Sequence, residues 1–392
     1  MQTIASSCPK QSQITRCCRP GTGSSGHGQG EGIMYIEHLG FDPETVPKLT
    51  FLQMLKRIGP GIVLTGVVIG PGAITTASML GANYGYDMLW LFIPIFIMGI
   101  TFMLTCYRIT MLTGLPIIHA IRHFYGKAAA AFVGCCLFLA CLFFTFGNIS
   151  GSGAGMNLLF GIDWKIGSLI MIAILLAMYF AKNTYSKVEK GILVCILAMI
   201  AAFYATLYVS GGPEWGGFFR GVTHWGFPNG SIRHSLAFIS THAAITAGVY
   251  GTYLGAEKKW NKKDMFNGTM LADAIAHVVT VILISGAVVL LNAGLDKDVS
   301  LESRLVRWSC TACIVFGTVI CFLYNGSPTQ LIFIANLATA IGTPTAGFFV
   351  TRMIWRKDVN EGLKPPRLLQ ISMTICYLFA LGMTIYALVA KL

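Results

Sequence analysis

Long apolar runs separated by short polar loops make up most of the chain. Nearly every run is close to the roughly 20 residues that an α-helix needs to cross the hydrocarbon core of a bilayer. The runs cover about residues 58–82, 86–108, 128–160, 165–182, 190–209, 233–256, 267–293, 308–324, 330–352 and 369–391. The pattern therefore predicts an all-α integral membrane protein with many membrane-spanning helices.

The middle of the first run is unsuited to a continuous helix. Gly70-Pro71-Gly72 lies inside the apolar stretch Ile58–Trp90. Proline removes a backbone donor, and the glycines let the chain leave helical geometry. In hydrocarbon an unpaired backbone group costs several kcal/mol, so a break survives only where it is buried in protein or lines a cavity. A broken helix of this kind is typical of a substrate site in a transporter, and a simple proline kink is the alternative.

The composition agrees with a membrane protein. The 392 residues are 55% hydrophobic and only 11% charged, with a mean hydropathy of +0.67, whereas soluble domains are about 25% charged. The formal net charge of +12 does not indicate nucleic-acid binding, because the basic residues lie in short loops between the apolar runs. These residues indicate membrane topology instead.

The loop charges predict a multi-pass protein with a cytoplasmic N-terminus, which we expect in the plasma (inner) membrane. Through the seventh run, the loops on the predicted cytoplasmic side carry a clear excess of Lys and Arg. These residues are Arg108, Arg122, Lys127, Lys182, Lys187, Lys190, Lys258, Lys259, Lys262 and Lys263. The alternate loops carry only Lys165, Arg220 and Arg233.

Two stretches resemble a known family. The first joins Gly70-Pro71-Gly72 through an apolar spacer to GANYGYDMLW at Gly81–Trp90, and the second is NLLFGI at Asn157–Ile162. Together they resemble the NRAMP family of divalent-metal transporters, over a region from about Thr50 to the C-terminus. The resemblance implies a LeuT-like bundle of two inverted five-helix repeats, in which the first and sixth helices are broken.

One helix of this arrangement is absent from the sequence. Continued alternation of the loops would place the basic segment 352–367 outside, and one further crossing between Gly294 and Glu302 would restore the charge rule. The family has its eighth helix there, whereas this chain has only LDKDVSL. We therefore predict that this helix is missing. Either the sequence carries a deletion, or the last three helices insert inverted, or one span re-enters without crossing. Failure of the charge rule is the alternative.

On this basis the chain divides into five segments. We expect a disordered tail, a cytoplasmic segment, a first five-helix repeat, an incomplete second repeat and a C-terminal transmembrane helix. They cover residues 1–33, 34–57, 58–210, 233–353 and 369–391, respectively. The second break is expected within Ser240–Tyr250, a segment that has small residues and hydroxyls but no proline.

The resemblance also places the family's site residues on this sequence. The Asp-Pro-Gly-Asn of the first break falls on Gly70, Pro71, Gly72 and Ala73. The Met-Pro-His of the second break falls on Ile245, Thr246 and Ala247, and the acidic positions of the proton route fall on Thr145 and Asn148. The family's carboxylate, amide and thioether ligands are thus absent from the positions that match its two breaks.

The expected site is therefore electrically neutral. A dehydrated divalent ion needs negative charge and several oxygen, nitrogen or sulfur ligands. Here only backbone carbonyls and the hydroxyls of Thr75, Thr241 and Thr246 are expected. Such a site suits a cation that keeps much of its water, as magnesium does, or a small organic solute. The free amides at the starts of the half-helices would favour a carboxylate on that solute.

Three ionisable residues within the runs are further candidates. Asp273 and His277 are four residues apart and share one helix face. They are candidates for a proton or ion relay, and the alternative is an interfacial Asp273 with His277 as its partner. His242 precedes the expected second break by about one turn, where it is either a substitute ligand or a hydrogen-bond partner of a neighbouring carbonyl.

These observations favour an NRAMP-like secondary transporter of a divalent metal ion, with magnesium or another weakly selected cation ahead of iron and manganese. A transporter of a small neutral or carboxylate-bearing solute is the second hypothesis, and a non-transporting sensor or defective paralogue is the third. The sequence shows no paired catalytic carboxylates, no phosphate loop and no nucleophile with a base. We therefore expect no enzyme and no cofactor, and as partners the lipid bilayer and the transported species.

Overall fold

The structure is a computed structural model that describes residues 41–50, 53–54, 57–179, 184–293, 336, 339–340, 342–360 and 363–389. Its contacts divide the chain into two units, Met1–Thr45 and Val46–Leu392. In the first unit the described residues contain a short 3-10 helix, η1 (Pro43–Thr45), where the Thr45 amide donates a hydrogen bond to the Asp42 carbonyl over 3.1 Å. The long helices of the described residues belong to the second unit.

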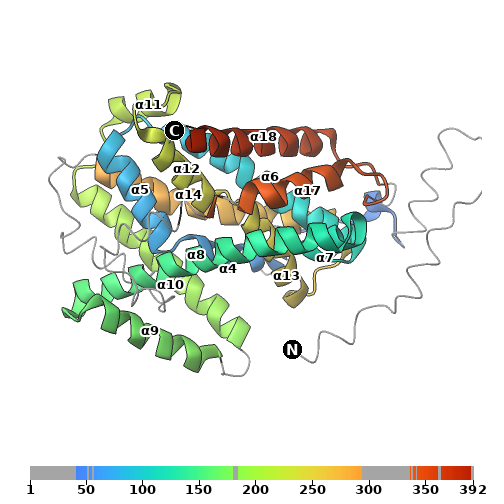
Figure 1. Cartoon of the computed structure of the whole chain (residues 1–392), viewed down its shortest axis with the longest axis horizontal. Coiled ribbons are helices and arrows are strands. Elements are labelled where there is room, and N and C mark those ends of the chain that lie inside the picture. Colours follow the sequence, from blue (N-terminus) through green and yellow to red (C-terminus); the bar gives the residue numbers. More distant parts are fainter. Residues whose placement is uncertain are drawn as a thin grey trace, which may run out of the picture. The chain divides into compact units, whose positions relative to one another are not determined.

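All regular structure in the described residues is helical, which confirms the predicted all-α fold (Figure 1). Five of the described helices are long and apolar enough to cross a membrane, and the bent pair α4 and α5 adds a sixth span. The elements are α4 (Pro60–Val68), α5 (Pro71–Tyr84), η2 (Leu89–Leu91), α6 (Phe92–Thr113), α7 (Ile117–Tyr125), α8 (Lys127–Phe160), α9 (Trp164–Tyr179), α10 (Thr184–Val209), α11 (Trp215–Thr223), α12 (Ser231–His242), α13 (Ile245–Glu257), η3 (Lys262–Met265), α14 (Thr269–Ala293), α17 (Gly342–Trp355) and α18 (Arg367–Val389).

The first predicted break is present. α4 ends at Val68, α5 starts at Pro71, and the chain bends by 58° between them. Because proline has no N–H, the carbonyl of Val67, four residues earlier, loses its helical donor. The Gly70 amide donates to the Val68 carbonyl, only two residues earlier, over 2.9 Å, so the helical pattern of hydrogen bonds ends here. Proline then suits the first turn of α5, because its fixed φ matches a helix start.

The second predicted break is present as well, although the chain has no proline there. α12 ends at His242 and α13 begins at Ile245. Just before the gap, the Thr241 hydroxyl donates to the Ala237 carbonyl over 2.7 Å, and Oγ of Ser240 lies 3.1 Å from the same oxygen. Such back-bonding by Ser and Thr weakens and bends helices. The same contact occurs inside the continuous helix α14, where Thr280 donates to the Ala276 carbonyl, so back-bonding favours a bend at the second break but does not by itself produce the break.

The two broken spans run antiparallel across each other. α4 contacts α13 and α5 contacts α12, so the first half of one span lies beside the second half of the other. The long helix α14 packs along both α4 and α5. This pairing places the two breaks at the same level of the bundle, as in transporters built from inverted repeats.

The loop between α17 and α18 lies at the same end of the bundle as α7. Arg356 donates to the Phe124 carbonyl over 3.2 Å, and Arg108 of α6 donates to the Leu363 carbonyl over 2.8 Å. The basic segment 352–367 is thus on the end that the loop charges predict to be cytoplasmic. This contradicts the alternative in which the last helices insert inverted.

Some predictions fall outside the described residues. These are the missing helix between Gly294 and Glu302, the apolar run 308–324 and the tail 1–33. They stay predictions.

Candidate functional site

A cavity of about 420 Å³ lies between the two broken spans and α8. Its walls are mainly apolar, and the polar groups on them are neutral. These polar residues are Cys141, Thr145, Ser240, Thr241, Thr246, Tyr250, Tyr253 and Thr339. None of the described residues that line it carries a carboxylate, ammonium or imidazole group.

Four of the residues predicted from the sequence line this cavity. They are Thr145 of α8, Thr241 of α12, and Thr246 and Ala247 of α13. Other predicted residues lie within the bundle without lining it: Pro71, Ala73 and Ile245 are buried, and Thr75 is half-buried.

Cys141 and two tyrosines were not predicted to belong to the site. Tyr250 and Tyr253 are both partly exposed and line the cavity, and the Tyr250 hydroxyl contacts the Cys141 sulfur. An aromatic residue or a cysteine inside an apolar run usually packs against lipid or protein, so the sequence carries no signal of this placement. Only the positions of α8 and α13 relative to each other reveal it.

Two asparagine side chains fill the space beside the first break. A Cβ added at Gly70 would lie 2.6 Å from Oδ1 of Asn148, and a Cβ added at Gly72 would lie 2.6 Å from Oδ1 of Asn336. Glycine at both positions therefore allows the amides to approach the backbone. Both amide oxygens are buried, and neither has a hydrogen-bond donor among the described residues.

Asn336 connects the two breaks. Its side-chain amide donates to the Gly72 carbonyl over 2.9 Å, and its backbone carbonyl accepts from the Ser240 hydroxyl over 3.0 Å. Sequence reasoning missed this residue. The signal was an amide side chain inside the apolar run 330–352, because polar residues within membrane spans commonly mark functional sites.

Both ring nitrogens of His242 are engaged inside the protein. Nδ1 lies 2.7 Å from the Phe238 carbonyl oxygen, and Nε2 lies 2.7 Å from Oγ of Ser285 on α14. A carbonyl only accepts, so Nδ1 carries the proton and Nε2 accepts from the hydroxyl when the ring is neutral. These contacts support the hydrogen-bonding alternative for His242 over the ligand alternative.

Asp273 binds the start of α4. Its carboxylate accepts from the backbone amides of Gly59 and Gly61 over 2.9–3.1 Å and from the Tyr107 hydroxyl over 3.1 Å. The first amides of a helix lack partners within that helix, and a carboxylate there is also favoured by the helix dipole. Asp273 is 0% exposed, so the protein encloses its carboxylate, and the partners found for it among the described residues are Gly59, Gly61 and Tyr107.

His277 also contacts α4. Its Nδ1 lies 3.0 Å from Oγ1 of Thr65 and 3.2 Å from the Gly61 carbonyl oxygen. The face that carries Asp273 and His277 is thus turned toward the first broken helix. A relay through these two residues stays a prediction.

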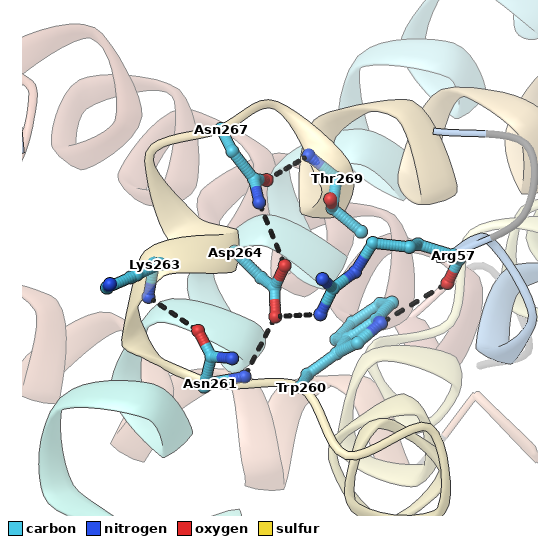
Figure 2. Close-up of polar contacts among 7 residues, drawn as sticks. All are labelled: Arg57, Trp260, Asn261, Lys263, Asp264, Asn267 and Thr269. Atoms are coloured by element: carbon cyan, nitrogen blue, oxygen red, sulfur yellow. Dashed lines mark hydrogen bonds and ion pairs between the residues drawn. The ribbon is translucent and has the colours of Figure 1, made fainter. Parts of the chain in front are cut away.

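A second buried carboxylate holds the residues that precede α4 (Figure 2). Asp264 of η3 accepts from Nη2 of Arg57 over 2.7 Å, and from the Asn261 amide and Nδ2 of Asn267 over 2.9 Å each. The Trp260 indole donates to the Arg57 carbonyl over 3.3 Å. The start of the first broken span is therefore fixed both to α14 and to the connection that precedes α14.

The described residues contain no group of three or more His, Cys, Asp or Glu side chains placed to hold a metal ion. Asp264 and Asp273 already accept several hydrogen bonds each. A cation at the breaks would therefore rely on neutral oxygens, supplied by carbonyls, hydroxyls and the two amides.

The profile of a family described as "Natural resistance-associated macrophage protein-like" (Nramp) matches residues 61–295, which is more than half of the chain. The resemblance was expected to continue to the C-terminus, whereas this match ends at residue 295.

Two similar proteins are divalent metal cation transporters named MntH. The chain is 27% identical to that of Brucella suis biovar 1 (strain 1330) over 172 residues, which cover 44% of this chain and 38% of the relative. It is 27% identical to that of Agrobacterium fabrum (strain C58 / ATCC 33970) over 168 residues, which cover 43% of this chain and 36% of the relative. The chain thus spans less than two fifths of the length of these relatives.

A solved structure shares the fold. The crystal structure of the Eremococcus coleocola manganese transporter, in complex with an aromatic bis-isothiourea substituted compound, gives a TM-score of 0.53 at 14% identity. The match covers 88% of this chain and 74% of that chain. At this identity the likeness concerns the fold alone, and it agrees with a bundle of inverted repeats.

Proposed function

The chain belongs to the Nramp family, and we propose that it is a multi-pass secondary transporter that moves a divalent metal cation through the site between the two helix breaks. One observation carries the proposal beyond family membership. The amide oxygens of Asn148 and Asn336 are buried beside the broken backbone without a hydrogen-bond donor among the described residues. A buried acceptor of this kind is costly unless a donor or a cation satisfies it.

The proposed cation is magnesium, or another weakly selected cation, rather than iron or manganese. The available oxygens carry no formal charge, so they do not compensate full dehydration of a divalent ion. Magnesium gives up its water reluctantly and is usually held by few protein ligands together with several waters. A cavity of about 420 Å³ beside the breaks gives such a hydrated ion room, although Asn148 and Asn336 are not among the residues that line it.

We also propose a cytoplasmic N-terminus and a location in the plasma (inner) membrane. The orientation is supported by the basic residues of 352–367, which share one end of the bundle with the basic residues of α7. Lys and Arg favour the cytoplasmic side of a membrane protein. The bilayer and the transported cation are the proposed partners.

A small organic solute is the second candidate, because the cavity walls are mainly apolar and include two tyrosine rings. The volume of about 420 Å³ lies within the ~300–1,000 Å³ typical of small-molecule pockets. The first amides of a helix lack partners within that helix, and those of Gly72 and Ala73 at the start of α5 would favour a carboxylate group beside the break. A neutral or carboxylate-bearing solute would satisfy both features.

Isothermal titration of the purified full chain with magnesium, manganese and calcium tests the first candidate. We expect magnesium binding that is lost in Asn148→Leu and Asn336→Leu. Asn83→Leu is the matched control, since Asn83 is an exposed amide on α5 whose side chain, among the described residues, donates to the Met79 carbonyl of the same helix. If the wild-type protein binds none of the three ions, the solute candidate moves ahead. A further absence of transport would favour a sensor or defective paralogue.

A Gly70→Asp variant tests whether the missing carboxylate is the only difference between this site and the metal site of the family. The new Cβ would lie 2.6 Å from Oδ1 of Asn148, so the substitution is combined with Asn148→Ala to make room. Gain of manganese binding in the double variant would support an NRAMP-like geometry that lacks only the carboxylate. The single variant Asn148→Ala is the reference, and a folded double variant that binds no more manganese than this reference would count against that geometry.

A further inference from the structure

Arg356 joins two basic segments at the end of the bundle where α7 lies. Its guanidinium carbon lies 5.2 Å from the ring centre of Phe124 and 5.1 Å from that of Tyr125. Nη1 also donates to the Phe124 carbonyl over 3.2 Å. The loop between α17 and α18 is thereby held against the end of α7, and Figure 1 shows both at the same end of the bundle.

The cations around this junction outnumber the acids. Asp358 binds Arg356 through two hydrogen bonds of 2.9 and 2.5 Å and neutralises it. Residues 116–127 and 352–367 together contain seven Lys and Arg but only two acidic residues. The other six cations are exposed, and we call them the α7 basic surface: Arg122, Lys127, Arg352, Lys357, Lys364 and Arg367.

Exposed hydrophobic side chains border the α7 basic surface directly. Trp355, between Arg352 and Arg356 in the chain, is 53% exposed, and its indole donates to Thr374 on α18. Leu368, next to Arg367, is 79% exposed. In membrane proteins exposed aliphatic side chains face lipid, and tryptophan collects at the boundary between hydrocarbon and water. The cations therefore lie at the level of the lipid head groups.

We propose that the α7 basic surface binds the phosphate groups of anionic phospholipids. Clustered Lys and Arg next to a membrane-spanning helix attract anionic head groups, and their stems can lie along apolar surface while the charged ends stay at the interface. A phospholipid fits better than a soluble polyanion, because only the lipid matches both the cations and the adjoining apolar face. This proposal does not depend on the transported substrate.

The test uses the full chain in nanodiscs of phosphatidylcholine, alone or mixed with phosphatidylglycerol. Native mass spectrometry measures which lipid the released protein retains, and a thermal melt measures stabilisation. We expect preferential retention of phosphatidylglycerol and a higher Tm in its presence. Lys357→Gln/Arg367→Gln should lower the preference about fivefold for each cation removed.

The matched control is Lys165→Gln/Arg233→Gln, which removes two cations from the loops of the opposite side. It should retain phosphatidylglycerol as the wild-type protein does. Equal retention by the wild-type protein and Lys357→Gln/Arg367→Gln, or an equal loss in the control, would overturn the proposal. A salt titration of the wild-type protein needs no variant. Because exposed charges are screened within about 10 Å at 0.1 M salt, a preference that is unchanged at high salt would also overturn it.

Discussion

The side-chain amide of Asn336 donates a hydrogen bond to the carbonyl of Gly72 over 2.9 Å, and these two residues are 264 positions apart in the chain. Through this bond the first broken span is tied to a segment of the second repeat. The same asparagine accepts from Ser240 at the second break. One buried residue therefore fixes the distance between the two breaks.

Gly72→Ala should destabilise the protein by about 1–3 kcal/mol, the usual cost of overpacking a filled interior. The added Cβ would lie 2.6 Å from Oδ1 of Asn336 and 2.9 Å from its Nδ2, and Asn336 is fully buried. Thermal unfolding in detergent measures the effect. Gly134→Ala is the control, because a Cβ at that helical glycine meets nothing within 4 Å. A Gly72→Ala variant as stable as Gly134→Ala would contradict the packing at the break.

Asp273→Ala should be among the most destabilising single substitutions. It would leave the amides of Gly59 and Gly61 and the Tyr107 hydroxyl without their acceptor, at about 1–3 kcal/mol for each buried unsatisfied group. Asp87→Ala is the comparison, because Asp87 forms an exposed ion pair with Arg220, and such pairs contribute only ~0–1 kcal/mol. Similar melting temperatures for the two variants would argue against Asp273 as the cap of α4.

Cys141 should report on access to the cavity. Its thiol is partly exposed and lines the cavity beside Tyr250, so a charged thiol reagent should modify it from water. Mass spectrometry measures the rate of labelling, and magnesium should slow it if the ion occupies the cavity. Cys106, which is buried, should stay unmodified under the same conditions. Equal labelling of the two residues would contradict the cavity as described.

The Arg356–Asp358 pair, in the loop between α17 and α18, should make the stability of the fold depend on pH. The hydrogen bond from Arg356 holds the pKa of Asp358 below its usual value. A depressed carboxyl pKa stabilises the fold above the unfolded value of about 3.9, and that stabilisation is lost as pH falls through the folded value. Melts between neutral pH and pH 3 should show a wild-type advantage over Asp358→Asn that disappears at the acidic end. An advantage that persists there would have another origin.

The sequence by itself determined the features that depend on neighbours along the chain. Run length and apolarity predict the spans, because each membrane helix must satisfy its own backbone. Pro71 predicts the first break, because the loss of one donor is a local event. The second break was expected from the symmetry of the two repeats, and the back-bonding of Thr241, which favours a bend, lies just before it.

Only the tertiary structure decided what those features contact. Asp273 reads as an interfacial residue or a relay in the sequence, yet it caps a helix more than 200 positions earlier. Asn336 stands out in the sequence only as an amide inside an apolar run, and its place beside Gly72 depends on how the two repeats pack. The same holds for Arg356, whose stacking on Phe124 and Tyr125 sets the side of the last loop. Contacts of this kind form between segments that are distant in sequence, so no periodicity or spacing along the chain encodes them.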